Sequence, residues 1–197
     1  MSDKLAFYDV NPNYADYLKQ FDNRIPNFNY SQNNKFVCGI VLSINGFDYY
    51  APISSNKQIF KTSFPIYDGN NIISTIRFSF MFPIPDGCCT QKDFRKIEDY
   101  RYRRLLNKEV LYCNQHLNQI LKKAAFIYDR TVNKKDPVLT NNCCDFKLLE
   151  QKSQCYIQQM QTYQLQPNSQ TAEPILPNEI PDIGTQGFGG QGFGGIS

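Results

Sequence analysis

The pattern of apolar and polar residues in the first half of the chain predicts an antiparallel β-sheet. Residues 36–44 and 47–53 are rich in β-branched and aromatic side chains, and Asn45-Gly46 lies between them. An Asn-Gly pair in this position is a strong signal for a hairpin, because a type I′ turn needs positive φ at both central residues. A short strand at residues 7–10 is expected to precede the hairpin.

A second pair of strands is predicted on either side of residues 68–71, which read Asp-Gly-Asn-Asn. These strands are expected at residues 64–67 and 72–83. Within residues 76–82 the even positions are isoleucine or phenylalanine, whereas the odd positions are Arg77, Ser79 and Met81. This alternation predicts a half-buried strand with one aromatic face.

Helical spacing dominates the second half of the chain. Residues 100–130 predict one long helix, because apolar side chains recur on a single stripe. The stripe consists of Leu106, Val110, Cys113, Leu117, Leu121 and Ala124. A loop at residues 133–142 separates it from a helix at 145–161, which Asp145 is placed to cap. A short helix is expected at residues 93–99, and Asn11-Pro12 is expected to open another near the N-terminus.

Together these elements predict an α+β fold, with an antiparallel sheet covered by helices, as a single domain over residues 1–164. Residues 165–197 have a different composition, with several prolines and Gln-Gly-Phe-Gly-Gly twice in succession. Such a segment cannot bury a core, so we expect a flexible Pro/Gly-rich tail. The alternative is a short peptide that orders on a partner.

Positive charge is concentrated in part of the chain. The net charge is +3, but residues 171–197 hold three acidic and no basic residues, so residues 1–170 carry +6. Residues 101–135 hold nine basic side chains against Glu109 and Asp129. This concentration predicts a polyanionic partner. A solvated helix face would have the same composition.

The composition disfavours membrane, secreted and metal-dependent proteins. No run reaches the roughly 18 apolar residues of a membrane span, and no secretory signal pattern occurs near the start, so a cytoplasmic location is expected. The seven cysteines lack C-x-x-C spacing and are expected to be free thiols. With His116 as the only histidine, and no acidic cluster or phosphate-binding motif, we expect no metal and no cofactor. His116 itself is expected to be structural.

The most reactive group of side chains follows the hairpin. Residues 51–57 read Ala-Pro-Ile-Ser-Ser-Asn-Lys and place two hydroxyls and an ammonium within four residues. Loops often carry functional groups, but this composition is also ordinary for a solvent-exposed loop.

The chain resembles the ToxN/AbiQ family of type III toxin–antitoxin systems in the order and spacing of residues 5–57. Weaker similarity continues at Phe78–Ile84 and Cys144–Glu150. The segments that carry the resemblance are Phe7-Tyr8, residues 13–18 (Asn-Tyr-Ala-Asp-Tyr-Leu), 21–27 (Phe-Asp-Asn-Arg-Ile-Pro-Asn), 39–46 (Gly-Ile-Val-Leu-Ser-Ile-Asn-Gly) and 50–57 (Tyr-Ala-Pro-Ile-Ser-Ser-Asn-Lys).

This resemblance implies a twisted sheet similar to that of MazF-type toxins and a metal-independent endoribonuclease. It further implies cleavage of cellular or phage RNA by 2′-hydroxyl attack, leaving a 2′,3′-cyclic phosphate, and a role in abortive phage infection. The implied inhibitor is a pseudoknotted repeat RNA antitoxin, which forms a closed RNA–protein hetero-oligomer with the toxin.

The resemblance also implies a set of catalytic residues. The family's loop reads Ala-Pro-Leu-Thr-Ser-Pro-Lys, so its hydroxyls and lysine correspond to Ser54, Ser55 and Lys57. Asn56 stands where the family has proline, which is expected to loosen the turn that presents the lysine. The remaining active-site positions of the family correspond to Tyr14, Tyr30 and Lys35.

These residue types suit RNA cleavage without a metal. The substrate's own 2′-hydroxyl is the nucleophile, so the protein has to move protons and stabilise the phosphorane oxygens. Our hypothesis makes Lys57 the base and Ser55 a donor to a phosphate oxygen, while the tyrosines stack on bases or hold a phosphate. Phosphate contacts are assigned to the predicted long helix, through Arg101, Arg103, Arg104, Lys108, Lys122 and Lys123.

Two other functions fit the same residues. A non-catalytic RNA-binding module would use the basic helix and the aromatic hairpin without cutting RNA. A protein-interaction subunit would instead dock a partner through the basic helix and the Gly-Phe-Gly-Gly tail.

Overall fold

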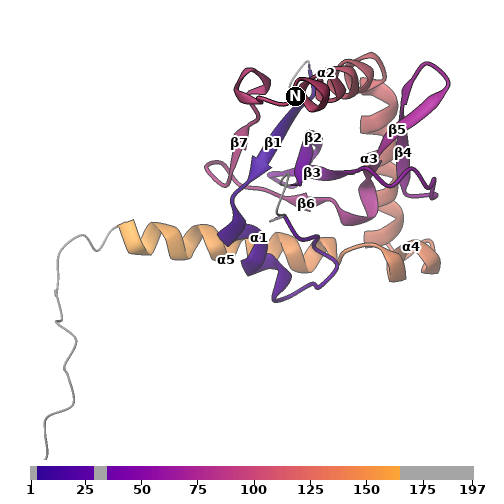
Figure 1. Cartoon of the computed structure of the whole chain (residues 1–197). Coiled ribbons are helices and arrows are strands. Elements are labelled where there is room, and N and C mark those ends of the chain that lie inside the picture. The colour runs from indigo at the N-terminus through magenta and orange to yellow at the C-terminus, as the bar shows by residue number, and fades with distance from the viewer. Residues whose placement is uncertain (1–3, 29–34, 165–197) are drawn as a thin grey trace, which may run out of the picture.

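The structure is a computed structural model that describes residues 4–28 and 35–164. Within these residues, an antiparallel sheet is covered by helices, and the predicted α+β fold is confirmed (Figure 1). The strand order is β4-β5-β3-β2-β1-β7, with β6 also paired to β3. The predicted tail at 165–197 and the predicted site residue Tyr30 lie outside the described residues.

The predicted hairpin forms the centre of the sheet. β2 (Phe36–Ile44) and β3 (Phe47–Ser54) pair antiparallel, and the register places Ile44 opposite Phe47. Asn45 and Gly46 have φ values of 53° and 79°, as a type I′ turn requires. β1 (Ala6–Val10) pairs with β2 on one side and with β7 (Cys89–Gln91) on the other.

The second strand pair also forms, but its second strand is shorter than predicted. β4 (Ser63–Asp68) pairs with β5 (Asn71–Arg77), and β5 joins β3 through Ile76 opposite Ile53. After Arg77 the chain makes a 3₁₀ turn, η1 (Phe78–Phe80), and then returns to β3 as the two-residue strand β6 (Phe82–Pro83).

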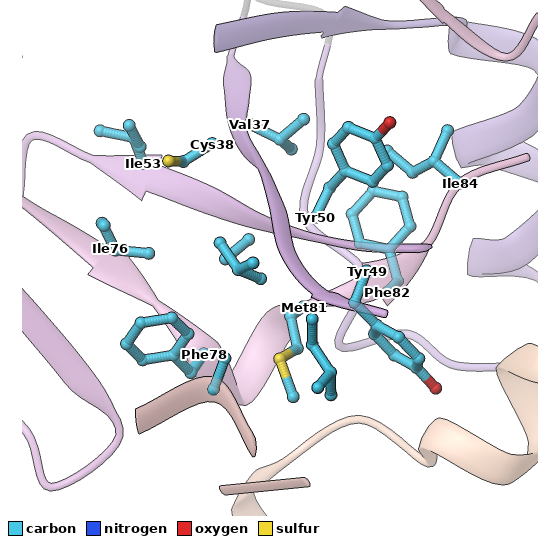
Figure 2. Packing of buried hydrophobic residues seen from close by; sticks show 14 of the residues in the cluster. Val37, Cys38, Tyr49, Tyr50, Ile53, Ile76, Phe78, Met81, Phe82 and Ile84 are labelled. Atoms are coloured by element: carbon cyan, nitrogen blue, oxygen red, sulfur yellow. The ribbon is translucent and has the colours of Figure 1, made fainter. Parts of the chain in front are cut away.

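The prediction of a half-buried strand with one aromatic face over residues 72–83 was therefore wrong beyond Arg77. Arg77, Ser79 and Met81 are all buried, so both sides of this segment face protein. The alternation of residue types did not correspond to an alternation of burial, because the chain turns at η1 and is packed from both sides. Figure 2 shows Met81 and Phe82 near the hairpin side chains Tyr49 and Tyr50, and Phe78 on the side of Ile76.

The prediction of one helix over residues 100–130 was also wrong, since two helices meet at His116. α2 (Tyr100–Gln115) ends where His116 adopts φ −111°, and α3 (Leu117–Val132) then runs in a different direction (Figure 1). The His116 ring stacks on Tyr112 with centroids 4.0 Å apart, and its Nδ1 lies 2.9 Å from the Tyr112 carbonyl oxygen. The bend lets α2 pack against β4 while α3 packs against β2 and α5.

The other helices follow local capping signals. Asn11 caps α1 (Pro12–Lys19) by accepting a hydrogen bond from the Asn13 N–H, and Asp145 accepts one from the Leu148 N–H at the start of α5 (Phe146–Gln164). α1 and α5 lie together at the end of the sheet opposite α2 (Figure 1).

Two shorter segments differ from the prediction. The segment expected to be a loop contains a short helix, α4 (Pro137–Asn142), because Asp136 caps it and proline occupies its first position. At residues 93–99 the structure has only a single 3₁₀ turn, η2 (Phe94–Lys96).

The described cysteines are free thiols, as predicted, and most of them are buried. Among the helices that the structure describes, none combines the length and the apolar character of a membrane span.

Candidate active site

The turn after β3 is held by its own polar groups. Ser54 Oγ accepts a hydrogen bond of 3.2 Å from the Asn56 N–H, and Asn56 Oδ1 accepts one of 3.0 Å from the Gln58 N–H. Thr75 on β5 donates its hydroxyl to the Asn56 carbonyl oxygen at 2.9 Å. Because Asn56 replaces the family's proline, this turn was expected to be looser, but these three hydrogen bonds hold it at Asn56.

A cleft of about 890 Å³ lies beside this turn. Ser54 and Asn56 form part of its wall, with Thr62 on the segment that leads into β4. Its basic side chains come from five separate parts of the chain: they are Lys19, Arg24, Lys35, Lys61 and Arg77. A cleft lined by one sign of charge concentrates ligands of the opposite sign, so its composition suits a phosphate backbone.

Two of these cations are partly withdrawn from water. Burial lowers the pKa of Lys35, and the nearby positive charge of Arg77 lowers it further. Arg77 is only 8% exposed, its guanidinium lies 4.5 Å from the centre of the Phe60 ring, and burial lowers its pKa as well. No carboxylate of the described residues forms an ion pair with Arg77. Desolvated positive charge of this kind stabilises an anion more strongly than an exposed lysine would.

A second hollow, of about 480 Å³, shares three of these residues. Lys35, Ser54 and Asn56 line both spaces, and Ser55 lines the second one. The rest of the second hollow is formed by β2, β3, β5 and α2. These contributors are Phe36, Ile53, Ile73, Ser74, Tyr102, Leu105 and Glu109. The residues at the end of β3 thus adjoin a basic cleft and a second, smaller hollow.

The structure brings some of the predicted catalytic residues together. Ser54, Ser55 and Lys35 line the same hollow, although Lys35 is 19 positions away from Ser54 in the sequence. Lys57 follows in the same turn, with an exposed side chain that lines neither space within the described part of the chain.

Tyr14 is placed differently, inside the core between α1, β6 and α5. Its side chain is 0% exposed, and its hydroxyl donates to the Pro83 carbonyl oxygen at 2.7 Å and lies 3.0 Å from Ser153 Oγ. Burial raises the pKa of this phenol well above its usual value. The catalytic role implied for Tyr14 stays a prediction, and its position favours a structural one.

The predicted phosphate-binding residues are divided between α2 and α3, and half of them have partners in the protein. Arg103 donates to the Ile97 carbonyl oxygen at 2.9 Å, Lys123 donates to the Ser63 carbonyl oxygen at 2.6 Å, and Lys108 forms an ion pair with Asp68. The exposed members of the set are Arg101, Arg104 and Lys122.

Five charged residues of the two spaces were not predicted as site residues from the sequence: Lys19, Arg24, Lys61, Arg77 and Glu109. Arg77 interrupts an otherwise apolar run, and Glu109 is the only acidic residue in α2. A charged residue at an otherwise apolar position is the signal that could have revealed the buried Arg77 and Glu109, because burial of a charge needs a compensating role.

Comparison with known proteins identifies the family. The family model described as toxin ToxN of the type III toxin-antitoxin system matches residues 6–154. The chain is 29% identical to endoribonuclease ToxN of Bacillus thuringiensis subsp. kurstaki, over 78% of this chain and 85% of the relative.

Two solved structures have the same fold. One is that of a bacterial type III toxin inhibited by a non-coding RNA pseudoknot; its TM-score is 0.73 at 28% identity, over 78% of this chain and 98% of the other. The other is that of AbiQ, a lactococcal anti-phage endoribonuclease, with a TM-score of 0.71 at 26% identity, over 79% of this chain and 99% of the other. Since the family model covers most of the chain, the predicted resemblance is confirmed, and the chain belongs to the ToxN family of type III toxin–antitoxin toxins.

Proposed function

We propose that this chain is a metal-independent endoribonuclease toxin that cuts RNA at the end of β3. The observation that carries the proposal is that Ser54 and Lys35 line both a basic cleft, which includes Arg77, and the adjoining hollow, which includes Ser55. The names of its relatives, endoribonucleases ToxN and AbiQ, support the reaction class. The expected substrates are cellular or phage RNA.

In the proposed reaction the substrate's 2′-oxygen attacks the adjacent phosphorus and the bond from phosphorus to the 5′-oxygen breaks. The products carry a 2′,3′-cyclic phosphate and a 5′-hydroxyl. One proton leaves the 2′-hydroxyl and one reaches the departing 5′-oxygen, so the site has to supply a base and an acid. Lys35 and Arg77 stabilise the extra negative charge on the phosphorane, and the Ser55 hydroxyl donates to one of its oxygens.

Two lysines compete for the role of base. Lys57 lies in the turn next to Ser55 and is the first candidate. Lys35 is the second, because burial and the charge of Arg77 lower its pKa, which makes the neutral amine easier to form. The pH dependence of the cleavage rate in the Lys57→Ala and Lys35→Ala variants distinguishes the two candidates. Replacement of the true base should abolish the increase of the cleavage rate with pH.

The proposed inhibitor is a pseudoknotted repeat RNA, and a related type III toxin of known structure is inhibited by a non-coding RNA pseudoknot. Its backbone would occupy the basic cleft, and the exposed Arg101, Arg104 and Lys122 would hold further phosphates. Several RNA repeats, each bound to a protein chain in this way, would form a closed RNA–protein assembly in the cytoplasm.

Induced expression in bacteria tests the proposal directly. Wild type is compared with Ser55→Ala and Lys57→Ala, and with Lys96→Ala as a control because Lys96 is exposed and lines neither space among the described residues. We expect growth arrest and RNA fragmentation with wild type and Lys96→Ala, and normal growth with the two site variants at equal soluble expression.

Purified protein tests the chemistry. Cleavage should persist in excess chelator, and the fragments should accept a 5′-phosphate from a kinase without prior phosphatase treatment, because their 5′ ends are hydroxyls. Salt-sensitive RNA binding without any cleavage by the folded wild-type protein would contradict the proposal and identify a non-catalytic RNA-binding module.

A further inference from the structure

Thr75 is a buried residue on β5 that forms a hydrogen bond with the turn after β3. It is 0% exposed, and its register partner across the sheet is Ser54, the last residue of β3. Its hydroxyl donates to the Asn56 carbonyl oxygen at 2.9 Å, two residues beyond the end of that strand. Valine has the same shape as threonine and suits a buried strand position as well, so packing alone does not call for a hydroxyl here. What the hydroxyl adds is the contact with the turn.

The turn consists of two small loops that meet at Asn56. In the first loop, Ser54 Oγ accepts from the Asn56 N–H at 3.2 Å, and Ser55 lies between them. In the second loop, Asn56 Oδ1 accepts from the Gln58 N–H at 3.0 Å, and Lys57 lies between them. Asn56 and Gln58 are exposed, so water competes for these bonds. The bond from Thr75 ties the joint between the two loops to the buried part of the sheet.

A fixed Asn56 carbonyl group restricts the position of Lys57. The C=O of Asn56 and the N–H of Lys57 belong to one planar peptide group, so holding the oxygen limits where the Lys57 Cα can lie. The direction of the hydroxyl is itself restricted, because a β-branched side chain on a strand has few χ1 rotamers. Within the described residues Thr75 lines neither the cleft nor the hollow, so it is placed to act on RNA only through the turn.

We propose that Thr75 is a positioning residue for RNA cleavage: its hydroxyl anchors the turn after β3, so that Ser55 and Lys57 keep one orientation toward the scissile phosphate. The inference rests on the proposed function, because it assigns a supporting residue to the same site. Asn56 stands where the family has proline, whose ring restricts φ, and the contact with Thr75 restrains the turn in a different way.

The contact should affect the rate of cleavage more than the stability of the fold. Asn56 is exposed, so water can bond to its carbonyl oxygen when the hydroxyl is removed. A reacting group displaced by about 1 Å, in contrast, can lower a rate by about 100-fold.

Two substitutions at Thr75 separate the hydroxyl from the packing. Thr75→Val removes the hydroxyl and keeps the shape, whereas Thr75→Ser keeps the hydroxyl and removes a methyl group. Single-turnover cleavage should fall by roughly 10- to 100-fold in Thr75→Val and stay close to wild type in Thr75→Ser. In urea Thr75→Ser should be the less stable of the two, because it leaves a small cavity, so stability and activity should rank the variants in opposite orders.

RNA binding and a matched substitution complete this experiment. A short RNA with a 2′-deoxy nucleotide at the attack position cannot be cut there, and its dissociation constant should be the same for wild type and both Thr75 variants, since the basic side chains of the cleft are intact. Thr131→Val is the matched control, because Thr131 is buried on α3 and lines neither the cleft nor the hollow among the described residues. It should cut RNA as wild type does.

Limited digestion with trypsin tests the anchoring without RNA. Lys57 is exposed in the turn, and cutting of the Lys57–Gln58 bond requires the turn to leave its folded shape. Thr75→Val should speed this cut by roughly 2- to 10-fold, the change in population expected from the loss of one hydrogen bond, whereas Thr75→Ser and Thr131→Val should not. The cut after the exposed Lys96 is the internal reference and should be equally fast in all four proteins.

Several results would overturn the inference. Wild-type rates of RNA cleavage and of the cut at Lys57 in folded Thr75→Val would show that the hydroxyl anchors nothing. An equal loss of cleavage in Thr75→Ser would assign the effect to packing, and a parallel loss of RNA binding in Thr75→Val would assign it to the binding surface. If wild type cuts no RNA, the proposed function fails, and the digestion by trypsin alone decides whether Thr75 anchors the turn.

Discussion

Replacement of Tyr14 by phenylalanine distinguishes a structural role from a catalytic one. The Tyr14 hydroxyl joins α1 to Pro83 on β6 and to Ser153 on α5. Phenylalanine keeps the ring and its edge-to-face contact with Tyr156, where the centroids are 5.0 Å apart. The substitution therefore removes hydrogen bonds and almost no apolar packing.

The expected loss of stability follows from the groups left behind. A net hydrogen bond contributes about 1 kcal/mol, and the buried Pro83 carbonyl and Ser153 hydroxyl would each lack a partner, so we expect a loss of about 1–3 kcal/mol. For a chain of this size each kcal/mol lowers the Tm by roughly 2–4 °C. Ser153→Ala, combined with Tyr14→Phe in a double-mutant cycle, should show a coupling energy of about 0.5–1 kcal/mol.

Urea unfolding measures the stability, and RNA cleavage per mole of folded protein measures the activity. The chain has no tryptophan, so unfolding is followed by tyrosine fluorescence and far-UV circular dichroism. Tyr17→Phe is the matched control, because Tyr17 is on the same helix and its hydroxyl makes no hydrogen bond within residues 4–28 and 35–164. Loss of cleavage in fully folded Tyr14→Phe would refute the structural role and support the catalytic one, and an unchanged urea midpoint would refute the hydrogen-bond argument.

Three further predictions concern stability. Gly39→Ala should prevent folding, because its Cβ would lie 1.9 Å from Cδ1 of the buried Tyr50 ring; a wild-type circular dichroism spectrum and Tm would disprove this. Glu109→Gln should become more stable than wild type as pH rises from 4.5 through 7. Because the folded-state pKa of Glu109 is raised, wild type loses about 3 kcal/mol of stability once the pH exceeds that pKa, whereas glutamine does not titrate. Urea midpoints that shift equally with pH in both proteins would contradict this prediction. Asp22→Asn should lose the most stability at neutral pH and little in acid. Burial by itself would raise the pKa of Asp22, but the Arg24 guanidinium lowers it below its usual value, so the stabilising contribution of Asp22 disappears as pH falls. A stability difference between the two proteins that does not depend on pH would exclude this explanation.

Local features of this fold could be predicted because they depend on neighbouring residues alone. Asn45-Gly46 specified the hairpin turn through the φ values that it tolerates. Asn11 and Asp145 specified two helix starts, since each caps an N–H group two or three residues further along. The family resemblance then identified Ser54, Ser55 and Lys35, which the fold places around one hollow.

Other features depend on elements that are distant in the sequence. β5 ends at Arg77, and protein covers both sides of the 3₁₀ turn that follows. The alternation of residue types in the sequence could not reveal that protein also covers the side with the polar residues. The bend at His116 likewise allows α2 and α3 to cover different parts of the sheet, although the apolar stripe continues through it.

The sequence by itself determined the hairpin, the helix caps, the α+β class and the family, because these depend on short-range geometry or on a recognisable order of residues. Only the tertiary structure decided that Arg77 joins Lys35 at the cleft, that Tyr14 is sealed in the core, and that Glu109 is buried with no ion-pair partner among the described residues. The physical reason is that burial and charge environment are properties of the assembled layers. The same arginine or glutamate would be an ordinary solvated side chain if the covering element lay elsewhere.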